Sequence, residues 1–218
     1  MKTQKIDFKQ ELKLILEELK DNRSNKIRKE DGFVPPYQGD SDIKLIIIGQ
    51  DPTIKNEKQR SKIKYTLNLD KDGALKRYIE QICKGLGISI NNVYATNVFK
   101  YFYSEPPAKT FDVLKKHLEP NIRLLNKELS AFPNIPIITL GEPVLKLLSF
   151  DEKVKVREYW GYNPHTGTSD GEFKFVSANE NKLGRTLFPF CHQPSIRKQF
   201  YKNTFVEYIN YVKRESRF

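Results

Sequence analysis

Cysteine and histidine are scarce in this sequence. Its 218 residues include two cysteines, Cys83 and Cys191, and three histidines, His117, His165 and His192. Four cysteine ligands for a structural zinc or an iron–sulfur cluster are therefore missing, and no two histidines stand at the i,i+4 spacing of a helical ligand pair. We expect no metal and no cofactor, and two buried thiols rather than a disulfide.

Long apolar runs are missing as well. The longest clear run, residues 45–48, is strand length, whereas a membrane span needs about 20 apolar residues. The N-terminus is charged and lacks the apolar core of a secretory signal. With a mean hydropathy of -0.62, the chain is expected to be a soluble, cytoplasmic monomer. Its length fits one domain over residues 1–218, in which residues 1–40 form an N-terminal helix and loop appendage.

Positive charge is in excess. The chain has 38 Lys and Arg against 27 Asp and Glu, a formal net charge of +11. Such a balance favours a polyanionic partner, and DNA fits it. A generally basic surface without a polyanion partner is the alternative, and charge alone does not name a reaction.

Short apolar blocks alternate with helical patterns along the chain. Four blocks predict strands, at 44–48, 92–96, 136–140 and 186–190. Helices are expected at 7–20, 73–84, 110–129 (capped by Thr110) and 143–148, and a last helix is expected to run through about Lys213. Between them, we expect a loop or short helix at 21–31 and a Lys-rich loop at 49–64. The stretch 151–184 is irregular and includes a candidate hairpin at 173–176. This alternation predicts an α/β, three-layer sandwich with a central, mostly parallel four-stranded sheet flanked by helices.

Polar side chains follow the predicted strands. Asp51 comes after the first, Asn97 after the second and His192 after the fourth. Ligands of parallel sheets bind outside the carboxyl ends of the strands, so these groups are expected to meet. A carboxylate stabilises the cationic sugar formed when a glycosidic bond breaks, a histidine can stabilise a departing base, and a carboxamide can read a flipped base.

Four motifs around these residues resemble those of the uracil-DNA glycosylase superfamily, in order and spacing, from about residue 43 to 210. They are Gly49-Gln50-Asp51-Pro52, Val93 to Lys100 with Pro106-Pro107, Ile138-Thr139-Leu140-Gly141, and His192-Gln193-Pro194-Ser195. The second motif is similar to that of the bacterial and archaeal branches. Branches with an iron–sulfur cluster use four cysteines, so the resemblance is to a cluster-free member.

The resemblance implies a role for each matching residue. Asp51 matches the carboxylate that positions water and supports the sugar cation, and His192 matches the imidazole that stabilises the departing base oxygen. Asn97 matches the residue that reads the base edge, and Tyr65 aligns with the aromatic that stacks on the base. Gln50 joins them as a base-binding residue. Ordinary structural roles, such as a turn-forming Asp or Asn and a half-buried His or Tyr, are the alternatives.

Two positions depart from the family pattern. Thr53 stands where members specialised for uracil carry a tyrosine that shuts out the thymine methyl, which predicts a base-binding pocket more open at the 5-position. Gln193 is inserted between His192 and Pro194, which the family usually keeps adjacent. The insertion is expected to shift the imidazole or the turn that follows it.

DNA contacts are expected on both sides of the site. Ile196 falls where the family places an apolar wedge that fills the gap left by the flipped base. Ser195 would hold a backbone phosphate. Further cations could contact phosphates without reading sequence; they are Arg197, Lys198, Lys55, Lys58, Arg60, Lys62 and Lys64.

These observations favour a monofunctional DNA glycosylase. It would hydrolyse the N-glycosidic bond of uracil or a related pyrimidine and leave an abasic site, as in base excision repair. One alternative is a glycosylase for 5-substituted or otherwise modified bases, and another is a non-catalytic DNA-binding module on the same fold. A phosphate-handling enzyme ranks low because no Gly-rich phosphate loop is present.

Overall fold

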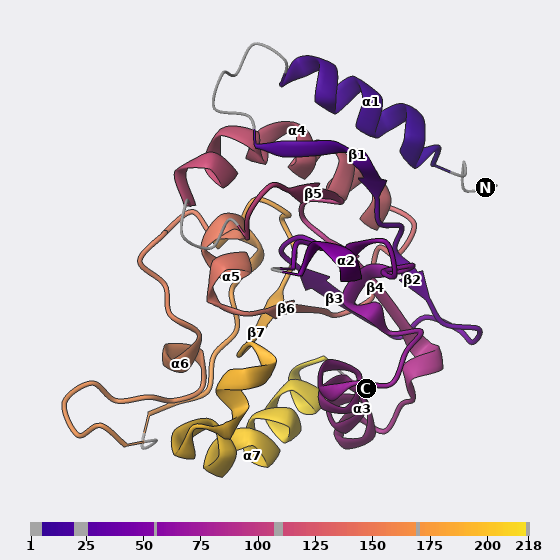
Figure 1. Ribbon diagram of the computed structural model, residues 1–218. Coiled ribbons are helices and arrows are strands. Elements are labelled where there is room, and N and C mark those ends of the chain that lie inside the picture. Colours follow the sequence, from indigo (N-terminus) through magenta and orange to yellow (C-terminus); the bar gives the residue numbers. More distant parts are fainter. Residues whose placement is uncertain (1–5, 20–25, 55, 107–110, 169–170, 217–218) are drawn as a thin grey trace.

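The computed structural model describes residues 6–19, 26–54, 56–106, 111–168 and 171–216 (Figure 1). Its centre is a five-stranded sheet with the strand order β2-β4-β3-β6-β7. The strands are β2 (Tyr37–Gln38), β3 (Leu45–Gly49), β4 (Val93–Asn97), β6 (Ile137–Leu140) and β7 (Leu187–Phe190). The predicted mostly parallel α/β sheet is confirmed, because β4, β3, β6 and β7 pair in parallel.

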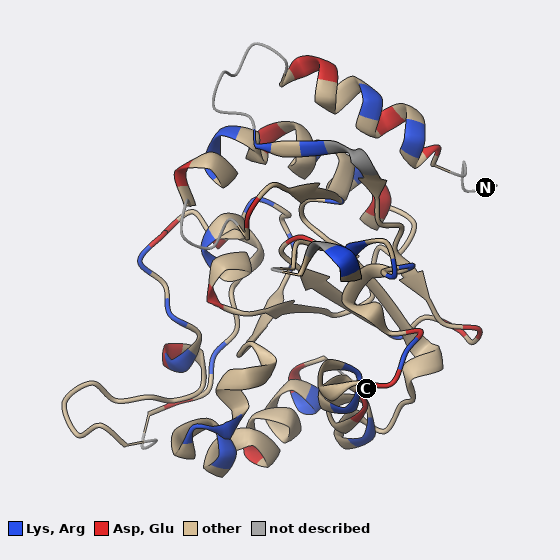
Figure 2. Ribbon diagram, viewed as in Figure 1, with Lys and Arg blue, Asp and Glu red and all other residues tan. Residues whose placement is uncertain are grey.

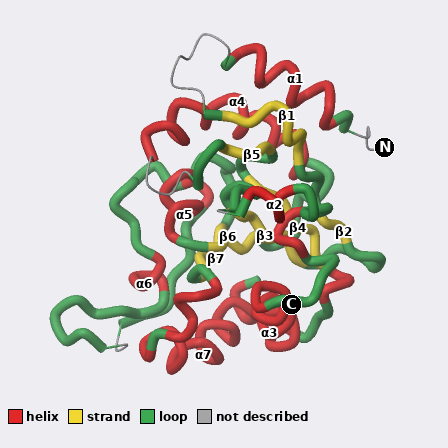
Figure 3. The backbone as a smooth tube through the Cα atoms, viewed as in Figure 1, coloured by secondary structure: helices red, strands yellow, loops and turns green. Residues whose placement is uncertain are grey.

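Helices cover both faces of the sheet (Figures 1 and 3). They are α1 (Phe8–Glu18), α2 (Glu57–Arg60), α3 (Ala74–Leu86), α4 (Phe111–Leu129), α5 (Glu142–Leu148), α6 (Val156–Tyr159) and α7 (Gln199–Glu215). α3 packs against α7 on one side, and α4 packs against α5 and α1 on the other. Because both faces are covered, every residue of the four parallel strands is buried, which explains their continuous apolar runs.

The five longer predicted helices are confirmed as α1, α3, α4, α5 and α7. α3 runs two residues past its predicted end at 84, to Leu86, and is capped by Gly87, which takes a left-handed φ of 81° and donates its N–H to the Cys83 and Lys84 carbonyls. Thr110, the predicted cap of α4, lies outside the described residues.

The sheet has one more strand than predicted. β2 lies at its edge and pairs antiparallel with β4, Tyr37 opposite Ala95. A two-residue strand is too short to show an alternating pattern, so its sequence carries no strand signal.

The prediction of a loop or short helix at 21–31 was wrong for its last part. Residues Ile27–Phe33 form β1, which pairs antiparallel with β5 (Tyr101–Tyr103), Ile27 opposite Tyr103. β1 is held in place by backbone pairing with β5 and not by an apolar face. Its charged sequence therefore lacks the pattern that predicts a strand.

The 151–184 stretch contains isolated bridges in place of the expected hairpin. Trp160 pairs with Phe173, and Val176 pairs with Leu187 of β7. Trp160 is fully buried and donates its indole N–H to the Pro189 carbonyl at 2.7 Å, so it packs in the core.

Both cysteines are free and buried, as expected. Among the described residues, no helix is long and apolar enough to span a membrane, and no cluster of His, Cys, Asp and Glu could hold a metal ion.

Candidate active site

A pocket of about 860 Å³ opens at the carboxyl ends of the parallel strands. Each of the four strands contributes a lining residue: Asp51 follows β3, Asn97 ends β4, Gly141 follows β6, and His192 comes shortly after β7. The three candidate chemical groups therefore meet in one cavity, although they lie up to 141 positions apart in the sequence (192 minus 51).

Asp51 is held by its neighbours in the first motif. Its Oδ2 accepts a hydrogen bond from Gln50 Nε2 at 2.6 Å, and its Oδ1 accepts one from the Thr53 backbone N–H at 2.8 Å. Burial raises the pKa of the carboxyl, while hydrogen bonds from Thr53 and Gln50 and the charge of Arg60 partly oppose the rise. The predicted base-binding residues Gln50 and Thr53 thus contact the carboxylate, and both line the pocket.

Asn97 points a buried amide into this site. It is 1% exposed, and its Oδ1 has no hydrogen-bond partner among the described residues. Gly49 pairs with it across β3 and β4, and a Cβ at Gly49 would collide with Asn97 Oδ1. The motif glycine therefore makes room for the amide. A buried oxygen without a donor costs about 1–3 kcal/mol, and a ligand N–H would satisfy it.

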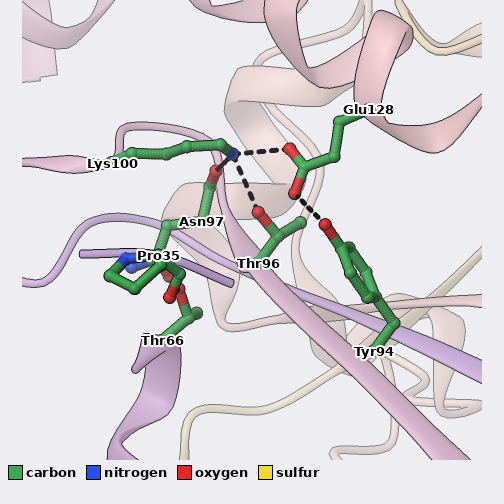
Figure 4. A network of polar contacts seen from close by, with 7 residues as sticks. All are labelled: Pro35, Thr66, Tyr94, Thr96, Asn97, Lys100 and Glu128. Atoms are coloured by element: carbon green, nitrogen blue, oxygen red, sulfur yellow. Dashed lines mark hydrogen bonds and ion pairs between the residues drawn. The ribbon is translucent and has the colours of Figure 1, made fainter. Parts of the chain in front are cut away.

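A buried polar network lies behind Asn97 (Figure 4). Lys100 Nζ donates to the Asn97 carbonyl at 3.0 Å and to Thr96 Oγ1 at 2.8 Å, and it pairs with Glu128 Oε2 at 2.6 Å. Glu128 Oε1 accepts from the Tyr94 hydroxyl at 2.7 Å. Sequence patterns did not predict the pairing of Lys100 with Glu128, although a lysine inside the apolar run 98–103 indicates a buried partner.

His192 lines the pocket with an exposed side chain. Burial of part of the ring lowers the pKa of its imidazole, which favours the neutral form. The Gln193 insertion is taken up by a short 3-10 helix, η5 (Gln193–Arg197), that begins directly after His192. Gly141, with φ 95°, packs close to the His192 Cβ, so the imidazole stays at the pocket despite the insertion.

Tyr65 does not line the pocket. It is 42% exposed and meets the Tyr37 ring edge-on, with 6.4 Å between ring centroids. Leu67 lines the pocket instead, in a left-handed conformation with φ 57°. The Thr66 N–H and hydroxyl both donate to the Pro35 carbonyl, which anchors this loop (Figure 4). Family alignment pointed to the aromatic, and no local pattern marked Leu67.

The predicted DNA-binding residues cluster at the end of η5. Arg197 and Lys198 are exposed, whereas Ser195 and Ile196 are half-buried, and none of the four lines the pocket. α2 also carries a lysine and an arginine, so residues of these types occur in both regions of the chain (Figure 2).

The basic side chains of the Lys-rich loop, residues 49–64, lie in different environments. Arg60 was predicted to contact phosphate, but it is 3% exposed and donates to the Ile54 and Ser104 carbonyls. Lys58, Lys62 and Lys64 are exposed, Lys62 also lines the pocket, and Lys55 lies outside the described residues.

Comparison with known families agrees with this geometry. The model of the uracil DNA glycosylase superfamily matches residues 36–213, which include every strand end described above. A search of curated proteins found no match. The family match supports a glycosylase type of function with DNA as the substrate. The chain therefore belongs to the uracil DNA glycosylase superfamily.

Proposed function

We propose that this protein hydrolyses the N-glycosidic bond of uracil, or of a related pyrimidine, in DNA and leaves an abasic site. One observation carries the proposal: the ends of parallel strands bring the Asp51 carboxylate, the Asn97 amide and the His192 imidazole into one pocket. These groups supply the three functions that release of a base requires. The proposed reaction uses no cofactor.

Asp51 acts at the sugar. Breaking the bond leaves positive charge on the sugar, and a nearby carboxylate stabilises that charge and positions water for attack. Hydrogen bonds from Gln50 and Thr53 hold both carboxylate oxygens in place. A group held in this way needs little reorganisation when the charge develops.

Asn97 and His192 act on the base. Asn97 Oδ1 finds no donor in the part of the chain that the structure describes, and it can accept the imide N–H at the edge of a flipped uracil. A base without that N–H would leave the buried oxygen unpaired, which is a strong source of discrimination. A neutral His192 donates its N–H to the base carbonyl oxygen, where negative charge gathers as the base departs.

DNA lies across η5 in this proposal. Arg197, Lys198 and Ser195 contact backbone phosphates, and Ile196 fills the space left by the flipped base. The net charge of +11 attracts the DNA and adds no sequence preference.

A second candidate substrate is a pyrimidine substituted at the 5-position. Thr53 is smaller than the tyrosine of uracil-specialised members, and a pocket of about 860 Å³ is of the size that holds drug-sized ligands. A substituted base therefore has room.

Base release from labelled oligonucleotides tests both candidates. Each oligonucleotide carries uracil, thymine opposite guanine, hypoxanthine or a 5-substituted pyrimidine, and alkali then cleaves any abasic site. Breaks at uracil alone support the first candidate, and breaks at larger pyrimidines support the second. No break on any substrate, with DNA binding intact, would contradict both and favour a binding module.

The same assay without alkali tests whether the enzyme is monofunctional. Lys62, Lys71 and Lys76 line the pocket. Lys71 donates to the Lys62 carbonyl and Lys76 pairs with Asp72, so the side chains of Lys71 and Lys76 are each held by a partner in the protein. We expect no strand break before alkali and no adduct on borohydride treatment. A borohydride-trapped adduct would show a lysine nucleophile and contradict the proposal.

A further inference from the structure

Thr53 contacts the proposed catalytic carboxylate as well as the pocket. Its backbone N–H donates to Asp51 Oδ1 at 2.8 Å. Its side-chain Oγ1 accepts the backbone N–H of Tyr103 at 2.7 Å. The hydroxyl therefore anchors the turn whose backbone N–H holds the Asp51 carboxylate.

The Tyr103 N–H is itself held in place. Tyr103 ends β5, where it pairs with Ile27 of β1, and the next residue, Ser104, donates its N–H to the Lys26 carbonyl at 2.7 Å. Residues 26 and 27 precede the region matched by the family, which begins at residue 36. The carboxylate is therefore connected through Thr53 to a strand pair that this chain builds from its N-terminal segment.

Arg60 ties the same turn to β5 a second time. Its buried guanidinium donates to the Ile54 carbonyl from Nε and to the Ser104 carbonyl from Nη2, both at 3.2 Å. The turn that carries Asp51 and Thr53 is thereby fixed on both sides. The positive charge of Arg60 also favours the ionised form of Asp51.

We propose that Thr53 is a positioning residue for Asp51: its hydroxyl, by accepting the Tyr103 N–H, fixes the turn from which the Thr53 backbone N–H holds the carboxylate toward the sugar. This assignment rests on the proposed glycosylase function. It gives Thr53 a role in positioning Asp51 beyond the predicted widening of the pocket at the 5-position of the base. A tyrosine carries its hydroxyl at the far end of the ring and has no group at this place. Thr53 therefore raises the rate of the reaction, in addition to any effect on the size of the base that the pocket accepts.

Two substitutions separate the hydroxyl from the methyl group. Thr53→Val keeps the shape and removes the hydroxyl, whereas Thr53→Ser keeps the hydroxyl and removes the methyl group. Without the anchor to Tyr103, the turn should move and weaken the hydrogen bond from the Thr53 N–H to Asp51. We expect Thr53→Val to lower kcat on uracil DNA by about 10- to 100-fold, the loss expected for one hydrogen bond to a charged group. KM should hold, the acid limb of the kcat–pH profile should move to higher pH, and Thr53→Ser should restore both.

A pocket-wall role gives the opposite pattern. Thr53→Val would then excise like the wild type, and Thr53→Ser would accept larger bases. That result would overturn the proposal. Thermal melting of both variants checks that any loss of rate is not a loss of fold.

A titration of Asp51 in the free protein separates this proposal from the function on which it rests. Carbon-13 NMR of the Asp51 carboxyl should show a higher pKa in Thr53→Val than in the wild type, with Thr53→Ser close to the wild type. If the shift appears but the wild type excises no base, the proposed function fails while the contact stands. If the wild type excises uracil and Thr53→Val titrates like it, the positioning role is wrong and the function stands.

Discussion

At the level of single residues, opposing influences set the pKa of the Asp51 carboxyl. Burial raises the pKa of its carboxyl, and hydrogen bonds from Thr53 and Gln50 lower it without cancelling the effect of burial. The folded protein therefore binds the Asp51 proton more tightly than the unfolded chain does. Ionised Asp51 lowers the free energy of unfolding at every pH above its folded pKa.

Asp51→Asn should accordingly stabilise the protein at neutral pH. The asparagine Oδ1 can still accept the Thr53 N–H, and its amide can donate to Gln50 once the Gln50 amide turns over. The gain should be full above the folded pKa and disappear below the unfolded value of 3.8. Urea unfolding at about pH 8 and at about pH 3.5 measures it. A variant less stable than the wild type at the higher pH would contradict this account of Asp51.

His192 makes a separate prediction about pH. Because partial burial lowers the pKa of its imidazole from the usual 6.5, the neutral ring is the major form at and above that pH. Single-turnover excision should therefore change by less than about twofold between about pH 6.5 and 8 and fall on the acid side. A sigmoidal step centred near 6.5 would show an ordinary, unshifted histidine.

At the level of elements, the pair between Lys100 and Glu128 joins the end of β4 to α4. Each side chain is 1% exposed. Lys100→Met would leave the buried Glu128 carboxylate without its cationic partner, which should cost about 3–5 kcal/mol of the free energy of unfolding. Urea unfolding measures the loss.

Arg123→Met is the matched control on the same helix. Arg123 pairs with Glu18 but is 54% exposed, so this change should cost less than about 1 kcal/mol. Equal losses in the two variants would contradict a structural role for the buried pair.

Sequence patterns predicted the parallel strands and the longer helices because each buries a face with a regular period. They missed β1, β2 and β5, which are short or charged and are held by pairing with distant segments. Arg60 illustrates the same limit at the site. Its charge indicated DNA contact, but one acceptor that buries it, the Ser104 carbonyl, lies 44 residues away. Leu67 likewise reaches the pocket through a backbone conformation that no periodicity reveals.

For the whole molecule, the N-terminal segment is more than an addition to the family domain. Through β1 it supports β5, and through Tyr103 it reaches Thr53. The sequence predicted an appendage over residues 1–40, but it gave no sign that this segment contacts the strand beside the site, because that contact depends on backbone pairing.

The positive charge of the whole molecule predicts salt-sensitive binding. Affinity for DNA containing an abasic site should fall linearly on a log–log plot against salt between about 50 and 200 mM, because each phosphate contact releases counterions. Lys198→Ala should reduce the slope by about one. Lys213→Ala, which removes the same charge at the far end of α7, should leave the slope unchanged. Fluorescence anisotropy of a labelled oligonucleotide measures the salt dependence of binding by both variants. Identical slopes would show that Lys198 does not contact the DNA.

The central claim is that Asp51 performs the chemistry in a pocket built to hold a flipped base. The most direct test compares wild type and Asp51→Asn in single-turnover release of uracil, alongside their binding to abasic DNA. The account predicts release by the wild type, a loss of at least about 100-fold in the variant, and equal binding by both. Release by Asp51→Asn at the wild-type rate would contradict it.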